Sequence, residues 1–405
     1  MSNLLRTPLY DRHVEVNATM VDFGGWEMPI QYPVGIVAEH LWTRRNAGMF
    51  DVSHMGRVVV SGEEMTEFLQ YVLTSNVAAL QVGMSQYCII ADENGYAIDD
   101  AYLYRFYEDR YLLVINASNR EKDLVHLNKV AENFKVTIVD ETFRSSCISV
   151  QGPTSEKVLM TLSGGKELTA ENKKNATGVV DFEGHTVWVS RTGYTGEPIG
   201  FEICCSNDDV QWLWKRLREA GAKPCGLGSR DTMRLESALP LYGHEFGVDK
   251  YGNEIPAYAV SLARFAVSFA EEKGNFIGRE KLLAQAEVMN NVREGKACDM
   301  SALPKRIVPV ALLGKGVMRA DMDVYQGDEL VGYVTSGTMV PYHKTQEMDC
   351  TESGKRAIGF AYINSNIVAG DKIEIDIRGK RSEAVVVAMH MKGMTRPLVI
   401  PVLAE

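Results

Sequence analysis

A tight turn at Asp92-Glu93-Asn94-Gly95 is the local feature that most restricts how this chain folds. Asn-Gly between two apolar runs is the strongest short-range sign of a β-hairpin, because both residues tolerate a positive φ. The two runs are residues 87–90 before the turn and 98–106 after it. The sequence therefore predicts a pair of antiparallel strands joined at this turn.

Two adjacent carboxylates, Asp99 and Asp100, begin the second strand of this hairpin. Acidic residues are disfavoured in strands, and successive side chains of a strand point to opposite faces of the sheet. One of the two carboxylates therefore lies on whichever face is buried. A buried carboxylate without a partner is costly and usually has a functional reason. The pair is the first candidate for a functional site.

The composition restricts the class of protein. The chain of 405 residues exceeds one ordinary hydrophobic core, so we expect two or three domains. A formal net charge of −10 and the lack of a basic run argue against a nucleic-acid-binding face. The seven cysteines include no C-x-x-C pair, which indicates neither a metal site nor a redox motif, and we expect buried thiols in a reducing compartment. Without a signal-like or membrane-spanning apolar segment, the sequence predicts a cytoplasmic enzyme.

The pattern of apolar residues changes near residue 306. Before it, stretches of helical spacing alternate with strand-like runs, which predicts mixed α+β structure. One predicted helix covers 36–47 with Gly48 as its C-cap. Another starts at a capping box, Ser118-Asn119-Arg120-Glu121, and runs to about Phe134.

After residue 306 the chain consists of short β-rich runs separated by Gly, Asp and Lys turns. This pattern is typical of a small all-β barrel or sandwich. We therefore expect a region of two α+β lobes at 1–255, a helical connector at 256–305 and a β-barrel domain at 306–405.

An Asp, a Ser and a His lie close together in Asp51-Val52-Ser53-His54. Such residues can perform hydrolase chemistry, but a catalytic triad normally assembles from separated segments of the chain. We therefore interpret this segment as a loop or strand edge whose side chains satisfy their own backbone.

Two charged residues occupy unusual local positions. Glu202 lies between apolar residues in a predicted strand, where it is either a solvated outward residue or part of a site. Gly226-Leu227-Gly228 resembles half of a dinucleotide loop, but Asp231 stands where the third glycine is required. Arg230 lies at a helix start and opposes the helix macrodipole. This favours an ionic task for Arg230, either with a ligand or in an ion pair with a neighbouring acid.

The ordered set of motifs resembles the aminomethyltransferase (T-protein) family of the glycine cleavage system. Each motif alone is weak, but the set extends over nearly the whole chain in the order of the family. The motifs are TPLY (7–10), FGGWEMP (23–29), FDVSHM (50–55), IDD (98–100), NASNREKD (116–123), QGP (151–153), TGYTGE (192–197), GLGSRDTMRLE (226–236) and LYG (241–243).

This resemblance implies a three-lobed α+β architecture, with two intertwined α+β lobes and a C-terminal all-β, barrel-like domain. It also implies a reaction. The methylene carbon of an S-aminomethyldihydrolipoyl group on lipoylated H-protein passes to tetrahydrofolate, and ammonia is released. Tetrahydrofolate would be the co-substrate and H-protein the protein partner.

The resemblance implies roles for individual residues. Asp99 matches the catalytic carboxylate, which would stabilise an iminium intermediate and pass a proton. Asp100 should point the other way and serves as an internal control. The predicted folate-binding residues are Glu202, Arg230, Met55, Tyr87 and Arg378.

The chain departs from the family pattern at 256–270, where a Gly-x-x-Trp segment is missing, and in the polar stretch 341–355. Two alternative functions therefore stay open. One is a tetrahydrofolate-dependent demethylase of a small N-, O- or S-methylated compound, which needs the same folate pocket but no lipoyl partner. The other is a non-enzymatic folate-binding protein, although the Lys-Gly-Cys-Tyr-x-Gly-Gln-Glu signature of that branch is absent.

Overall fold

The computed structural model of the chain describes residues 4–169, 173–344, 352–392 and 400–401. Its residues form two compact units that interleave along the chain. Unit 1 consists of Met1–Gln70, Val77–Tyr87 and Ala101–Asp231, and unit 2 of Tyr71–Asn76, Cys88–Asp100 and Thr232–Glu405. The expected three-part division of the chain stays a prediction.

The predicted hairpin is present. Strand β5 (Met84–Ala91) is followed by β6 (Ala97–Arg105), and the two are neighbours in one sheet. In the turn, the backbone N–H of Gly95 donates to the carbonyl of Asp92 over 3.1 Å, and Gly95 has a φ of 79°. The tip of the hairpin belongs to unit 2 and the rest to unit 1.

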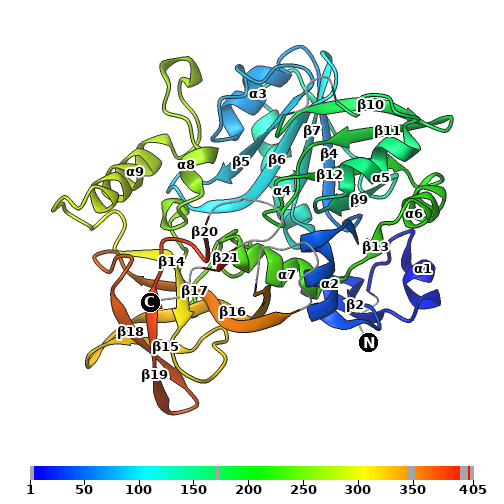
Figure 1. Cartoon of the computed structure of the whole chain (residues 1–405). Coiled ribbons are helices and arrows are strands. Elements are labelled where there is room, and N and C mark those ends of the chain that lie inside the picture. The colour runs from blue at the N-terminus through cyan, green and yellow to red at the C-terminus, as the bar shows by residue number, and fades with distance from the viewer. Residues whose placement is uncertain (1–3, 170–172, 345–351, 393–399, 402–405) are drawn as a thin grey trace. The chain divides into compact units, whose positions relative to one another are not determined.

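Unit 1 is built around two sheets (Figure 1). One has six strands, and its order is β10 (Thr177–Phe182), β11 (His185–Ser190), β12 (Gly200–Ser206), β9 (Ser145–Gln151), β3 (Gly48–Asp51) and β13 (Lys223–Pro224). The other has five, with β5 and β6 followed by β7 (Arg110–Ile115), β4 (Gly56–Ser61) and β8 (Thr137–Asp140). A separate hairpin joins β1 (Thr19–Phe23) and β2 (Trp26–Gln31). The helices that begin in this unit are α1 (Tyr10–Glu15), α2 (Gly35–Arg45), α3 (Met65–Val72), α4 (Arg120–Ala131), α5 (Ser155–Leu162), α6 (Val210–Glu219) and α7 (Leu227–Glu236).

Strand alternation gives the six-stranded sheet two different faces. Ile203 of β12 and Ile148 of β9 point into a core that also contains Leu159 of α5 and Leu213 of α6. Glu202 and its neighbours on the opposite face are only partly buried. Helices α5 and α6 therefore close one face and leave the other for a site.

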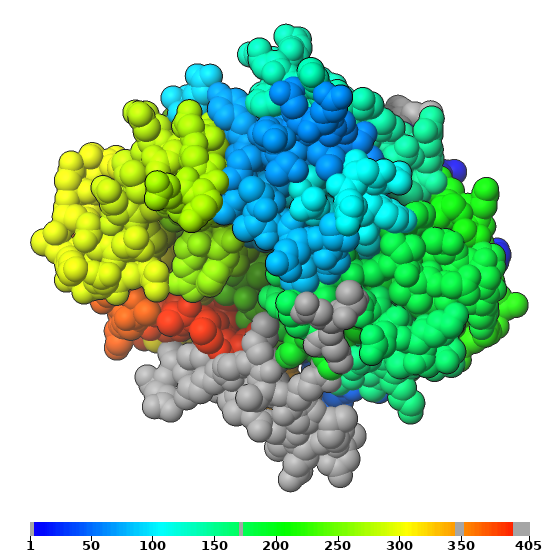
Figure 2. All heavy atoms as spheres, turned by 90° about the horizontal axis from the view of Figure 1, so that it is seen from above, coloured from blue at the N-terminus to red at the C-terminus, as the bar shows by residue number. Residues whose placement is uncertain are grey.

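The second sheet of unit 1 alternates in the same way. In β7, Tyr111 and Leu113 are buried, whereas Leu112 and Val114 are half-buried. In the space-filling view, cyan residues lie against green residues from a later part of unit 1 (Figure 2). Unit 1 thus has two half-buried sheet faces from which a pocket can form.

Unit 2 contains a closed six-stranded barrel, as predicted from the β-rich runs. Its strands, in order around the barrel, are β14 (Lys305–Leu312), β17 (Ser353–Asn364), β16 (Glu329–His343), β15 (Asp323–Gln326), β18 (Lys372–Ile377) and β19 (Lys380–Val386). The charged segment before it forms α8 (Ala263–Ala266), α9 (Arg279–Arg293) and two short 3-10 turns. A short pair, β20 (Met391–Lys392) and β21 (Ile400–Pro401), completes the unit. Within the polar stretch 341–355, residues 345–351 lie outside the described residues.

Two predicted helix boundaries are wrong. Helix α2 ends at Arg45 with Asn46 as its C-cap, and Gly48 instead begins β3, where a Cβ would overlap the Thr43 side chain. The predicted capping box does not form either, because a 3-10 turn at Ala117–Asn119 precedes α4 and the N-cap residue of α4 makes no side-chain capping hydrogen bond. None of the helices in the described ranges combines the length and apolarity needed to cross a bilayer.

The side-chain amide of Gln151 fixes the loop that follows β11. Its Nε2 donates to the carbonyl of Thr192 over 3.1 Å, and its Oε1 accepts from Thr195 Oγ1 over 2.7 Å. A Cβ at Gly193 or Gly200 would overlap this amide. Gly193 and Gly200 are therefore needed for space, because Gln151 fills the volume that side chains would occupy.

We expect Gly193→Ala to lower the free energy of unfolding by about 1–3 kcal/mol, since the added methyl group must displace a buried, hydrogen-bonded amide. Urea denaturation followed by circular dichroism measures the change. Gly314→Ala is the control, because a Cβ there meets no atom within 4 Å. Equal stability of the two variants would contradict this account of the loop.

Candidate functional site

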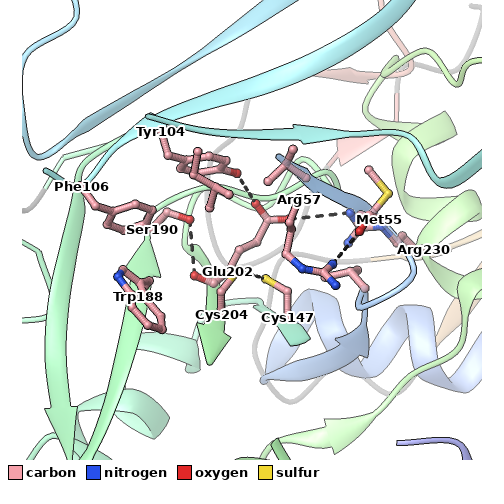
Figure 3. A pocket seen from close by; sticks show the side chains of 13 residues that line it. Met55, Arg57, Tyr104, Phe106, Cys147, Trp188, Ser190, Glu202, Cys204 and Arg230 are labelled. Carbon is pink, nitrogen blue, oxygen red and sulfur yellow. Dashed lines mark hydrogen bonds and ion pairs between the residues drawn. The ribbon is translucent and has the colours of Figure 1, made fainter. Parts of the chain in front are cut away.

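Unit 1 contains a pocket lined by residues of both its sheets (Figure 3). It contains about 450 Å³ of empty space, a volume that includes space open to solvent. Most of its walls are apolar or aromatic. These wall residues are Val52, Met55, Tyr104, Phe106, Leu112, Val114 and Trp188.

Glu202 is the carboxylate of this pocket. Its Oε2 accepts hydrogen bonds from Thr192 Oγ1 over 2.6 Å and from Tyr104 Oη over 3.0 Å. Thr192 is itself held by Ser190 Oγ at 2.8 Å. Because both donors end on one oxygen, Oε1 is left on the side of Arg230 (Figure 3). The carboxylate is thus fixed in orientation before any ligand arrives.

Arg230 lies beside Glu202 without forming a close ion pair. Its Nη2 is 3.9 Å from Glu202 Oε1, and its Nη1 is buried with no hydrogen-bond partner. Burial lowers the pKa of Arg230, and Glu202 opposes this shift. A buried donor without an acceptor costs about 1–3 kcal/mol. This unsatisfied N–H is the observation that most directly indicates a missing ligand atom.

Arg57 lines the same pocket but is fully engaged. Its guanidinium donates to the carbonyls of Met55 and Ser145 and to Ser145 Oγ, at 2.6, 2.8 and 2.8 Å. These bonds join β4 to the start of β9, so Arg57 supports the pocket wall rather than offering donors to a ligand.

The structure brings together three of the predicted folate-binding residues. Glu202, Arg230 and Met55 line this one pocket. Tyr87 is not among the lining residues, and its ring is tilted against that of Tyr102, with centroids 6.1 Å apart. Arg378 lies in unit 2, exposed in the turn between β18 and β19 with a φ of 58°. The roles of all five residues stay predictions.

The two acids of β6 occupy opposite faces of the strand, as predicted. Asp99 is 0% exposed and shares its face with the buried Ala101 and Leu103. Asp100 is half-buried and shares its face with Tyr102 and Tyr104. The catalytic assignment of Asp99 is untested, but in this structure the carboxylate on the accessible face is Asp100.

Comparison with known proteins places the chain in a family. A family model described as the GCVT N-terminal domain matches residues 9–255. The chain belongs to this family. Among curated relatives named aminomethyltransferase, that of Bacillus cytotoxicus is 40% identical over 395 residues, or 96% of this chain and 98% of the relative. That of Lysinibacillus sphaericus is 36% identical over 393 residues, or 95% and 97%.

A solved structure agrees with this placement. The crystal structure of glycine cleavage system aminomethyltransferase T from Bartonella henselae matches with a TM-score of 0.78 and 27% sequence identity. The match covers 95% of this chain and 97% of that one. The resemblance found in the sequence and the predicted fold class, mixed α+β with a barrel, are therefore confirmed.

Sequence reasoning missed several residues of this pocket in the GCVT-family chain. Tyr104 and Thr192 hold the Glu202 carboxylate, and Phe106 and Trp188 form part of the wall. A usable signal was present for two of them, because aromatic residues at every second position after the acid pair mark one face of a strand. Thr192 depends on a contact across the sheet, which the sequence does not display.

The Asp51–His54 segment forms no catalytic triad. Asp51 accepts from Thr7 Oγ1 at 2.6 Å and from the backbone N–H of Ser53 at 2.9 Å, and its Oδ2 lies 3.0 Å from His13 Nε2. Ser53 Oγ donates to the carbonyl of Cys147. The ring of His54 instead meets Phe23 edge-on, and burial lowers the pKa of His54 to about 4. Only the bond from the Ser53 N–H lies within the segment, and β3 is flanked by β9 and β13, so these side chains mainly join neighbouring segments rather than satisfy their own backbone at a strand edge.

The lowered pKa of Asp51 should make the stability of the protein depend on pH in the acid range. Burial alone would raise its pKa, but hydrogen bonds from His13, Ser53 and Thr7 hold the pKa at about 2, against 3.8 for a free carboxyl. A lowered folded-state pKa adds stability that is present above about pH 4 and is lost as the pH falls through 2. We expect the Asp51→Asn protein to have a lower free energy of unfolding than the wild type at pH 6. The difference between the two free energies should narrow by about 2 kcal/mol by pH 2.

Urea denaturation of both proteins between pH 6 and pH 2 measures this narrowing. Carboxylates that the two proteins share cancel in the comparison. A difference that stays constant over this range would show that Asp51 does not titrate with a lowered pKa.

Proposed function

We propose that this protein is an aminomethyltransferase that uses tetrahydrofolate as its co-substrate. It transfers the methylene carbon of the S-aminomethyldihydrolipoyl group of H-protein to the folate and releases ammonia, in the cytoplasm. Membership of the GCVT family and the names of the relatives support the reaction. The observation that carries the folate site is the fixed Glu202 carboxylate next to the unsatisfied Nη1 of Arg230.

The residues present fit a reduced pterin. A pterin is a flat heterocycle whose edge carries N–H donors beside a carbonyl oxygen. Glu202 offers an acceptor whose position is set by Tyr104 and Thr192. Arg230 Nη1 offers the donor that a carbonyl or carboxylate oxygen needs. The aromatic and aliphatic walls suit the two ring faces.

The chemistry requires a carboxylate near the reacting amine. A folate amine attacks the methylene carbon as ammonia departs. The C–S bond to the lipoyl arm then breaks and leaves a dihydrolipoyl thiol, so positive charge develops as an iminium on the transferred carbon. A carboxylate stabilises this cation, orients the amine and accepts its proton, and such acid–base help contributes about 10²–10⁴ in rate. The acid pair on β6 supplies this group in our proposal.

The test of this function is a transfer assay with purified protein, tetrahydrofolate and H-protein loaded with the aminomethyl group. We expect methylenetetrahydrofolate and ammonia to form in equal amounts. H-protein that lacks its lipoyl arm is the control and should support no transfer. Methyl transfer from a small methylated donor, with none from loaded H-protein, would instead identify a demethylase.

The acid pair provides a second test, because the sequence favours Asp99 and the accessibility of the strand face favours Asp100. We expect Asp100→Asn to lower kcat by about 10²-fold or more while folate still binds. Asp99→Asn should mainly lower stability, since Asp99 has no exposed surface. Measurements of kcat, folate affinity and the urea midpoint show whether Asp99 or Asp100 is the catalytic acid. Loss of turnover in a stable, folate-binding Asp99→Asn protein would restore the assignment made from the sequence.

A further inference from the structure

Two cysteines meet across the strands that form one wall of the pocket. Cys147 of β9 and Cys204 of β12 are directly paired in the antiparallel register, and both line the pocket. Both are free thiols, and their sulfur atoms point toward one another at 2.6 Å (Figure 3). Neither residue has a part in the function proposed above.

The register alone makes a disulfide between them feasible. Directly opposed residues of antiparallel strands have Cα atoms about 4.5–5.5 Å apart, and a disulfide spans Cα atoms about 4.4–6.8 Å apart. The neighbouring Cys205 points to the other face of β12, into the core under α5 and α6. It therefore cannot replace Cys204 in this pair.

The two thiols differ in accessibility. Cys204 is half-buried and lies two residues after Glu202 on the same face of β12, whereas Cys147 is 7% exposed. The hydrogen bond with Cys204, together with burial, raises the pKa of the Cys147 thiol. Because Cys204 is the more exposed of the two, it is the sulfur that an incoming reagent meets first.

We propose that Cys204 and Cys147 form a dithiol that clears the pocket of bulky thiol adducts. Cys204 thiolate attacks a low-molecular-weight disulfide, RSSR, breaks its S–S bond, forms the mixed disulfide Cys204–S–S–R and releases one RSH. Cys147 then attacks the Cys204 sulfur, the S–S bond of the mixed disulfide breaks, and a second RSH leaves. The protein dithiol is oxidised and RSSR is reduced, and the two thiol hydrogens end on the released thiols.

The consequence for ligand binding rests on the proposed folate site. An R group on Cys204 would occupy the pocket beside Glu202, because both side chains line it. The disulfide between Cys147 and Cys204 adds no atoms and leaves the pocket open. The pair thus replaces a mixed disulfide that blocks the pocket with an internal disulfide that leaves the pocket open.

The test treats the full-length reduced protein with oxidised glutathione and compares the wild type with Cys147→Ser, Cys204→Ser and Cys298→Ser. Intact mass and peptide mapping identify each product. The wild type should lose two hydrogens and yield a peptide pair linked through 147 and 204. Cys147→Ser should retain one glutathionyl group on Cys204, and Cys204→Ser should retain none at this pair. Cys298→Ser, a half-buried cysteine outside the pocket, should behave as the wild type.

Binding of 5-formyltetrahydrofolate, a reduced folate that resists oxidation, provides the second readout. We expect the glutathionylated Cys147→Ser protein to bind it at least about tenfold more weakly than the same protein after dithiothreitol. Oxidised wild type should bind within about threefold of its reduced form. Cys147→Ala repeats the measurement if the serine variant does not fold.

Peptide mapping tests the dithiol proposal independently of which ligand the pocket binds. A glutathionyl group that persists on wild-type Cys204 as long as on Cys147→Ser, or a link from Cys204 to another cysteine, would overturn it. If the reduced wild type bound no folate, the proposed function would fail, while the linked peptides would still support the dithiol.

Discussion

The side-chain amide of Gln151 joins the segments on which the pocket of unit 1 depends. It lies where side chains at Gly193 and Gly200 would have to be, and it binds the backbone carbonyl of Thr192. The hydroxyl of that same Thr192 holds the Glu202 carboxylate. An amide buried in this way must satisfy its donors and acceptor locally, so the position of the carboxylate follows from the packing of Gln151. The QGP and TGYTGE motifs are far apart in the sequence, but the hydrogen bonds of Gln151 join them in the structure.

Buried charged groups in this protein differ in how many of their polar atoms have hydrogen-bond partners. This difference distinguishes residues that support the structure from residues that can bind a ligand. Glu245 of unit 2 accepts from Arg234, the backbone N–H of Leu241, Thr335 and Ser336, at 2.9, 2.9, 2.6 and 2.6 Å. Such saturated groups, like Arg57 in unit 1, have little left to offer a ligand. Arg230 differs because one of its buried nitrogens lacks an acceptor. Arg230 is also less buried, with 17% of its side chain exposed, against 1% exposure for Arg57 and 0% for Glu245.

Much of the fold could be predicted from the sequence where the signal is local. The Asn94-Gly95 turn needs only its own φ angles, and the alternation that places Asp99 and Asp100 on opposite faces is a property of any strand. The barrel could be predicted from short β runs separated by turn residues. Helix ends were harder to predict. Position 48 is a glycine because a Cβ there would overlap the Thr43 side chain, and not because a helix ends there.

The site shows the same limit. Glu202 and Arg230 could be selected as charged residues in unusual local positions, and they line one pocket. Which of two adjacent acids is accessible depends on which face of β6 the rest of the molecule covers. The partners of Glu202 come from β6 and from the loop after β11. Side-chain contacts between distant strands leave no mark in a single sequence.

The interleaving of the two units has a consequence for biosynthesis. All of unit 1 has been synthesised once Asp231 has been made, whereas the hairpin tip Cys88–Asp100 belongs to a unit whose main part is still to come. This tip contains strand residues Ile89 and Ile90, which are fully buried in the complete protein. Exposed apolar strand edges of this kind promote aggregation in nascent chains. The carboxylate pair thus sits in the part of the early sequence that matures last.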